Sequence, residues 1–175
     1  MPSVLRTARL ELVPFPPEAI QHLLRGERTQ ASAIIGLELP EEFPSQQDLD
    51  GFLCIQLHRM LATPDGRGWT ARLITTRKPR RLIGHAGFHG PPEIIGRAEI
   101  GYTIFAAYRG HGYAKEAARA LVEWAFEQGQ REVFASVAPD NAPSLAVLRS
   151  LGFLQVGTQL DDVDGPELVF AIRKH

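Results

Sequence analysis

The chain has 175 residues, of which 44% are hydrophobic and 22% charged, and its formal net charge is −1. These values are ordinary for a soluble globular domain, so we predict one domain over residues 1–175. The small net charge gives no reason to expect a nucleic acid or a membrane surface as partner. A single cysteine, and the lack of a signal-like start or a long apolar run, indicate a cytoplasmic protein.

In the first half of the chain, alternating apolar and polar residues predict a strand over 7–13, and helical spacing predicts a helix over 18–25. Residues 28–44 fit neither pattern. Ser45 is a candidate N-cap for a helix that runs to about residue 62, with Asp48 three positions later as its capping partner.

The second half begins with three predicted strands, at 69–76, 81–88 and 97–105. A long amphipathic helix over 112–128 follows, and the remaining predictions are a strand at 132–137, a helix at 141–151 and strands at 153–159 and 167–173. This order of elements predicts an α/β domain with a mixed sheet.

Residues 109–114, Arg-Gly-His-Gly-Tyr-Ala, join the third of these strands to the long helix. Glycine lets the backbone approach a ligand closely, and the first amides of a helix have no partner within it. Because these amides lie at the positive end of the helix dipole, the turn is suited to a phosphate. The spacing fits neither a P-loop nor a dinucleotide-binding fingerprint. A glycine-rich turn that only begins a helix is the alternative.

The pattern over 109–114 resembles the Q/R-x-x-G-x-G/A pyrophosphate loop of the GCN5-related N-acetyltransferase (GNAT) superfamily. The segments 141–144 (Asn-Ala-Pro-Ser) and 151–153 (Leu-Gly-Phe) are similar to a second motif, found in the branch that includes the ribosomal-protein amine acetyltransferases. The opening segment 7–12, Thr-Ala-Arg-Leu-Glu-Leu, also resembles that branch. The similarity covers most of the chain, although it is only general over 26–66.

The resemblance implies a mostly antiparallel mixed sheet, flanked by helices, whose central strands splay apart. The strand at 99–105 would diverge from the one at 132–137, with the pantetheine arm of acetyl-CoA in the gap like an added strand. Gly101 would be a bulge or twist point. The implied cofactor-binding residues are Tyr102, Thr103, Ile104, Phe105, Arg109, Gly110, His111, Gly112, Tyr113, Ala114 and Asn141.

Two of these residues have a simpler interpretation. His111 is alternatively an exposed loop residue, and Asn141 is alternatively only the N-cap of the helix that follows it. The two roles of Asn141 do not exclude each other. The six histidines form no spaced cluster of metal ligands, so no metal is expected.

Acetyl transfer to an amine needs a proton acceptor, because a free alkyl amine has a pKa of ~10 and is mostly protonated at pH 7. The resemblance implies that Glu99 is this base; alternatively it is a solvated carboxylate at a strand end. Ser144 is the candidate donor to the departing thiolate, with a first-turn helix residue as the alternative. Tyr102 and Tyr113 are further candidates for the donor.

The sequence is least informative about the residues that recognise the acceptor amine. Trp69, His85, Phe88, His89 and the loop 89–96 are expected to border the acceptor cleft. The acidic turn at 161–164 could attract a cationic amine, or could simply be solvated.

The leading hypothesis is an acetyl-CoA-dependent N-acetyltransferase whose acceptor is a primary amine, either a protein N-terminus or a small molecule, attacking directly. The alternatives are a non-catalytic acyl-CoA-binding module and an enzyme acting on nucleotide phosphates. A homodimer is left open.

Overall fold

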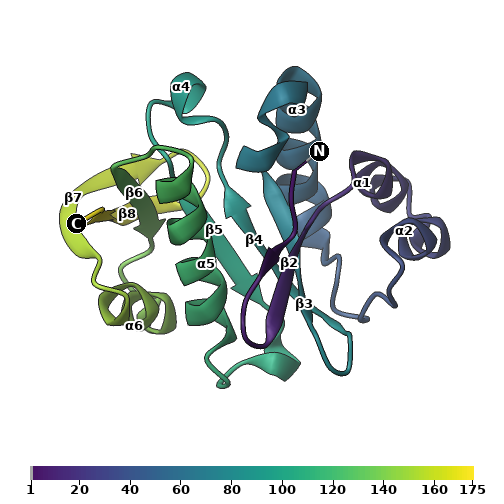
Figure 1. Cartoon of the computed structure of the whole chain (residues 1–175). Coiled ribbons are helices and arrows are strands. Elements are labelled where there is room, and N and C mark those ends of the chain that lie inside the picture. The colour runs from purple at the N-terminus through teal and green to yellow at the C-terminus, as the bar shows by residue number, and fades with distance from the viewer. Residues whose placement is uncertain (1) are drawn as a thin grey trace.

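Five antiparallel strands form the main sheet in the computed structural model, which describes residues 2–175 (Figure 1). Each strand pairs with the next along the chain, so the order in the sheet is that of the sequence. The strands are β1 (Leu5–Arg6), β2 (Leu10–Pro14), β3 (Ala71–Thr76), β4 (Leu82–Phe88) and β5 (Ile100–Ile104).

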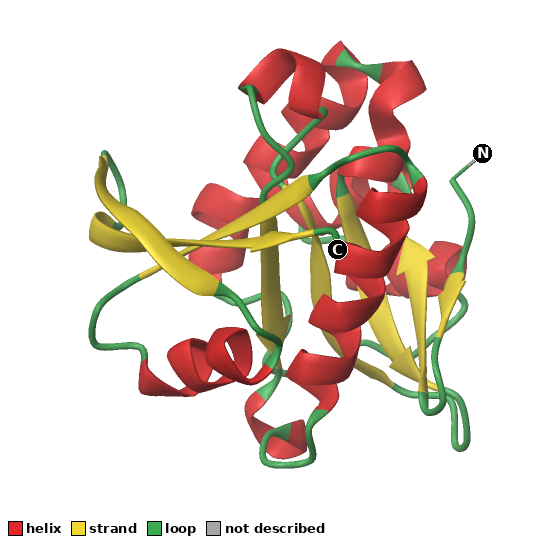
Figure 2. Ribbon diagram, turned by 60° about the vertical axis from the view of Figure 1, so that its left-hand side comes forward, coloured by secondary structure: helices red, strands yellow, loops and turns green. Residues whose placement is uncertain are grey.

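A second, three-stranded antiparallel sheet continues from β5 and carries the C-terminal hairpin, which extends outward in Figure 2. Its order is β6 (Glu132–Val137), β8 (Gly165–Arg173) and β7 (Leu154–Asp161). The two sheets meet where the Phe134 amide donates to the Ala98 carbonyl at 2.8 Å, beside a parallel bridge between Glu99 and Phe134. Beyond this point β5 and β6 form separate sheets, which confirms the predicted splay of the central strands.

Helices cover both faces of the main sheet. On one face, α5 (Tyr113–Glu127) and α6 (Ala142–Ser150) contribute apolar side chains to a core shared with both sheets. On the other face, α1 (Pro17–Leu24), α2 (Arg28–Ile35) and α3 (Leu53–Ala62) enclose a second core. The short α4 (Pro92–Ile95) lies in the β4–β5 connection. Among residues 2–175, no helix has both the length and the apolarity needed to cross a bilayer.

The strand predicted at 7–13 corresponds to β2, which starts only at Leu10 because residues 7–9 connect it to β1. The Thr7 hydroxyl accepts a hydrogen bond from the Leu10 amide at 2.9 Å. Side chains that bond nearby backbone in this way compete with strand pairing, and the alternation of residue types does not reveal it.

The Ser45–Asp48 pair is confirmed. The Ser45 hydroxyl accepts from the Asp48 amide at 3.1 Å, and the Asp48 carboxylate accepts from the Ser45 amide at 2.8 Å. One π-helical turn, Asp48–Phe52, separates this cap from α3. The segment 28–44, which fitted no pattern, contains α2, which ends at Gly36 with a φ of 75°.

Two glycines let β4 pack closely against its neighbours. A Cβ atom on Gly84 would lie 2.1 Å from the Thr103 carbonyl oxygen, and one on Gly87 would lie 2.4 Å from the Thr70 carbonyl oxygen. Both obstacles are backbone atoms, so neither can rotate away. A side chain at either position would therefore force β4 out of register with β3 or β5.

We expect Gly84→Ala to lower the free energy of unfolding by about 3 kcal/mol, the upper end of the usual cost of overpacking. The matched control is Gly157→Ala on β7, where no atom lies within 4 Å of the added Cβ, and it should change stability by less than about 0.5 kcal/mol. Urea denaturation measures both. Equal losses in the two variants would contradict the close packing of β4 and β5.

Candidate active site

The backbone of β5 presents hydrogen-bonding groups to two sides. Toward β4, the Phe105 amide donates at 2.8 Å and the Glu99 carbonyl accepts at 2.9 Å. Successive residues of a strand point their backbone groups in opposite directions. The amides of Tyr102 and Ile104 therefore face away from β4, into the gap where β6 has separated.

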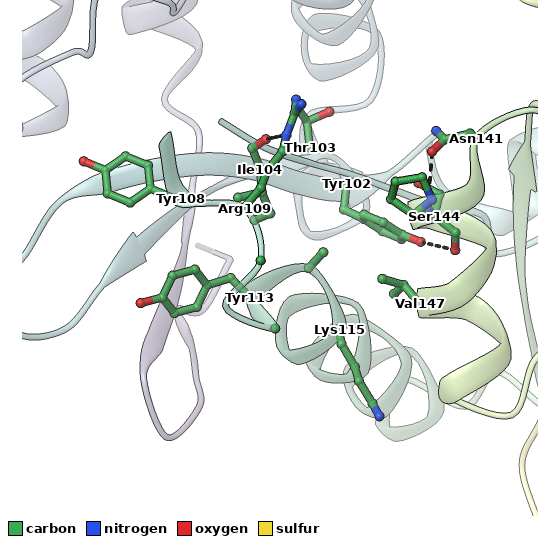
Figure 3. Close-up of a pocket in the computed structure, with 14 residues that line it drawn as sticks. Tyr102, Thr103, Ile104, Tyr108, Arg109, Tyr113, Lys115, Asn141, Ser144 and Val147 are labelled. Atoms are coloured by element: carbon green, nitrogen blue, oxygen red, sulfur yellow. Dashed lines mark hydrogen bonds between the residues drawn. The ribbon is translucent and has the colours of Figure 1, made fainter. Parts of the chain in front are cut away.

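A cavity of about 660 Å³ opens at this edge, between β5, the turn before α5 and the first turn of α6 (Figure 3). It brings together residues from three segments that are distant in sequence. Ten of the predicted residues line it: Tyr102, Thr103, Ile104, Arg109, Gly110, Gly112, Tyr113, Ala114, Asn141 and Ser144. Four further lining residues were not predicted: Tyr108, Lys115, Pro143 and Val147.

The turn into α5 is built from two glycines in the left-handed region, Gly110 with φ 81° and Gly112 with φ 78°. Other residue types are strained there, which explains why glycine occupies both positions. Within the described chain, the amides of residues 110–115 make no backbone hydrogen bond. Unpartnered amides at the positive end of a 15-residue helix suit an anion.

The N-terminal segment anchors this turn. Arg9 Nε contacts Glu116 Oε2 at 2.7 Å, and Arg9 Nη1 donates to the His111 carbonyl at 2.8 Å. Burial alone would raise the pKa of Glu116, but hydrogen bonds from Thr7 and Arg9 outweigh it and the pKa lies below its ordinary value. Glu116 is thus ionised at neutral pH and ties the start of α5 to the connection between β1 and β2. The opening motif resembled the family, but sequence alone did not reveal this role.

Two predicted cofactor residues lie outside the cavity. The Phe105 amide is used by β4, and its ring stacks on Phe43 with centroids 5.2 Å apart, in the core on the opposite side. The His111 ring is exposed, lies 3.1 Å from the Tyr108 carbonyl oxygen and stacks on Tyr113. Neither ring faces the cavity, because strand direction turns Phe105 away and local stacking holds His111 against Tyr113.

Arg109 lines the cavity but does not extend freely from the turn. Its Nε donates to the Ile104 carbonyl at 2.9 Å (Figure 3). The guanidinium thus lies along the open edge of β5, where it occupies the carbonyl of Ile104 and leaves the amide available.

The first turn of α6 places two polar side chains at the cavity wall. Asn141 caps the helix, since its Oδ1 accepts from the Ser144 amide at 3.3 Å, and its amide nitrogen remains available as a donor. The Ser144 hydroxyl makes no hydrogen bond within residues 2–175. Tyr102 donates to the Ser144 carbonyl at 3.3 Å, and burial raises the pKa of this phenol to about 12.

Glu99 is buried, with 7% of its surface exposed, so it is not the solvated strand-end carboxylate of the alternative interpretation. Arg97 Nη2 lies 2.7 Å from one carboxylate oxygen, and the Ser136 hydroxyl donates to the other at 2.6 Å. Ser136 is on β6, so these contacts join β5 to β6 at the point where the sheets meet. Glu99 is not among the residues that line the cavity.

The residues expected at the acceptor cleft divide between the two faces of β4. Phe88 is 1% exposed and packs with Trp69 and Trp124 on the α5 side, so the expectation was wrong for Phe88 and Trp69. His85 is on the α3 side, where it stacks on Phe52 with centroids 4.1 Å apart.

His85 and the acidic turn are both accounted for by local structure. Burial lowers the pKa of His85 to about 4, so its ring is a neutral part of the core. Asp161 accepts from the amides of Val163 and Asp164, both at 2.8 Å, which favours a structural role for the acidic turn. Of the expected cleft side chains, His89 remains accessible, with 42% of its side chain exposed.

Gly101 is not a bulge, because the β4–β5 register is continuous; the irregularity lies in β3, between Ile74 and Thr75. Instead, Gly101 makes room for a neighbour. A Cβ atom there would lie 3.2 Å from Nε2 of His89. The imidazole therefore lies over β5, on the strand face that also carries Glu99 and Thr103.

Comparison with known sequences identifies acetyltransferases as relatives of this chain. The model of the acetyltransferase (GNAT) domain family matches residues 9–154. The uncharacterized N-acetyltransferase YjdG of Bacillus subtilis is 30% identical over 128 residues, 71% of this chain and 74% of its own. The uncharacterized N-acetyltransferase p20 of Bacillus licheniformis is 35% identical over 89 residues, so the chain spans only about half of that relative's length.

Solved structures share the fold. An acetyltransferase from Agrobacterium tumefaciens is 26% identical, with a TM-score of 0.68 over 99% of this chain and 96% of its own. The ribosomal L7/L12 α-N-protein acetyltransferase RimL, solved with coenzyme A, is 19% identical, with a TM-score of 0.66 over 98% of each chain.

The glycine turn can be tested with two nearly isosteric substitutions. Asparagine tolerates the left-handed region better than most residues, and aspartate differs from it mainly by its charge. If the turn holds the diphosphate, Gly112→Asp should abolish binding of coenzyme A in a calorimetric titration, whereas Gly112→Asn should retain measurable affinity. Equal affinities in the two variants would contradict an anion at this turn.

Proposed function

Because the chain belongs to the GNAT acetyltransferase family, we propose that it transfers the acetyl group of acetyl-CoA to a primary amine by direct attack. The observation that carries this proposal is the cavity, which joins an open strand edge to a turn of unpartnered amides. These two features match the two parts of coenzyme A, an amide-bearing arm and an anionic diphosphate.

The cofactor would bind through the backbone. The amides of residues 110–114 would bind the diphosphate, and Arg109 would add a charge-assisted contact. The pantetheine arm would pair with the open edge of β5 at Tyr102 and Ile104, as an added strand does. The side-chain amide of Asn141 would donate to the same arm. Structural neighbours solved with coenzyme A or acetyl-CoA support this choice of ligand.

The acetyl group would then lie near the gap between β5 and β6. A free amide of β5 would polarise the thioester carbonyl and stabilise the developing oxyanion. The buried Glu99 would supply the basic centre for the acceptor amine, and the Ser144 hydroxyl would donate to the departing sulfur. Thr103 connects the two regions, because it lines the cavity and lies on the strand face of Glu99.

A panel of amines with acetyl-CoA, followed by release of free thiol, tests the activity. The panel should include peptides with different N-terminal residues, as well as small primary amines. We expect thiol release with at least one member, and no release in Gly112→Asp. Saturable binding of acetyl-CoA without thiol release from any amine would contradict the proposal and favour a non-catalytic acyl-CoA-binding module.

The role of Ser144 can be separated from that of its neighbour Tyr102. A hydrogen bond to a charged group contributes about 1.5–3 kcal/mol, so Ser144→Ala should lower kcat by roughly 10- to 100-fold. Its affinity for acetyl-CoA should change little, since the capping amide of residue 144 is retained. Tyr102→Phe is the comparison. A larger loss of kcat in Tyr102→Phe than in Ser144→Ala would assign the donor to the phenol instead.

A further inference from the structure

We propose that His89 is the catalytic base for the acceptor amine and that Glu99 is a positioning residue acting through it. This inference rests on the proposed function and replaces its simplest form, in which Glu99 takes the proton itself. It is carried by the placement of the two side chains on neighbouring strands and by the contacts that already occupy Glu99.

Glu99 is held on several sides. Arg97 contacts one carboxylate oxygen through two nitrogens, at 2.7 and 2.8 Å, while the Ser136 hydroxyl donates to the other oxygen at 2.6 Å. Gln159 donates to Ser136 at 3.0 Å and accepts from Arg97 at 2.9 Å, which closes the network. Both oxygens of the Glu99 carboxylate are therefore already occupied by neighbouring side chains.

His89 lies beside Glu99 and is the more exposed of the two, with 42% of its side chain exposed against 9% for Glu99. Its Nδ1 lies 3.7 Å from Oε1 of Glu99, the oxygen that Ser136 also contacts. This separation is longer than a hydrogen bond, as catalytic contacts often are before substrate binds. The other nitrogen, Nε2, lies over Gly101, where an added Cβ atom would approach it to 3.2 Å. Nδ1 therefore faces the Glu99 carboxylate, and Nε2 faces the surface of β5 beside the cavity.

The position of Nε2 suits an acceptor amine. Thr103, two residues beyond Gly101 on the same strand face, lines the cavity. Two residues of a strand span about 7 Å. We place the amine nitrogen within this span, between the imidazole and a thioester at the open edge of β5. Glu99 lies two residues before Gly101 on the same strand face, on the far side of the imidazole from the amine.

Burial favours the neutral form of His89 at pH 7. It is the largest cause and lowers the pKa of His89 below its ordinary value of 6.5; Glu99 and Asp161 raise the pKa, while Arg59 and Arg97 lower it. A neutral imidazole whose Nδ1–H faces Glu99 has its lone pair on Nε2, as a base requires.

The proton transfer balances simply. The lone pair of the acceptor nitrogen forms the N–C bond, and one N–H proton passes to Nε2 of His89. The C–S bond breaks, and the thiolate leaves with its electron pair, accepts a hydrogen bond from the Ser144 hydroxyl and takes its proton from water. The imidazolium is stabilised by Glu99 and returns its proton to water before the next turnover.

The test is the pH dependence of kcat/KM in the intact protein, with the best amine of the panel. The wild type should lose activity as pH falls through the pKa of His89, below 6.5, because protonation removes the base. His89→Gln should lose this acidic limb and fall by at least about 100-fold. Glu99→Gln should keep the limb, shifted to lower pH because the charge that raises the pKa is gone, with a loss of about 10-fold. His58→Gln, an exposed site on α3, is the matched control and should resemble the wild type.

The opposite pattern would overturn the inference. If His89→Gln retains the acidic limb and Glu99→Gln loses it, Glu99 is itself the base. A protein that releases no thiol with any amine contradicts the proposed function as a whole, so the two failures are distinguishable. Nitrogen-15 NMR gives a readout without turnover: at pH 7.5 the His89 ring should be the Nδ1–H tautomer, and an Nε2–H tautomer would contradict its role as base.

Discussion

The separation of β5 from β6 is the constraint on which the rest of the site depends. One backbone hydrogen bond, from Phe134 to Ala98, ends the contact between the two sheets, and beyond it the amides of Tyr102 and Ile104 face a cavity. Strand amides normally pair with a neighbouring strand, so an open edge inside the fold selects a ligand that can supply acceptors. The glycine turn offers a second set of unpartnered amides, and the two sets lie along one continuous cavity.

Two ion pairs hold the ends of this open edge. Near the turn, Glu116 binds Arg9 and fixes the start of α5 to the first strands. At the other end, Glu99 binds Arg97 and reaches Ser136 on β6. Each carboxylate joins segments that are distant in the sequence. Such fixed geometry is what a site needs if donors are to be in place before the substrate arrives.

Local patterns in the sequence predicted much of this frame. Short-range patterns predict the strand at 132–137, the long helix and the glycine turn. The bounds of these elements in the structure agree with the predicted bounds within a residue or two. Alternation along β4 also separates two of the residues expected at the acceptor cleft: Phe88 and His85 are an odd number of residues apart, so they must face opposite sides of the sheet. This explains why both could not border one cleft.

Other features depend on contacts that no local pattern contains. Thr7 and Glu116, which form a hydrogen bond, are 109 residues apart. The ring of Phe105 lies in the core on the opposite side from the cavity, where it stacks on Phe43. The position of His89 over Gly101 depends on the register between β4 and β5, which the sequence does not state. Short-range spacing identified which residues form the site, whereas the separate role of each residue could be inferred only from the fold.

Amide hydrogen exchange, followed by NMR with and without coenzyme A, tests the central claim most directly, because it reports each backbone donor separately. The account predicts that exchange at Tyr102, Ile104 and residues 110–114 slows on addition of the ligand, while Gly101 and Thr103, already paired with β4, show little further change. Unchanged exchange at Tyr102, Ile104 and the turn, in protein saturated with coenzyme A, would contradict it.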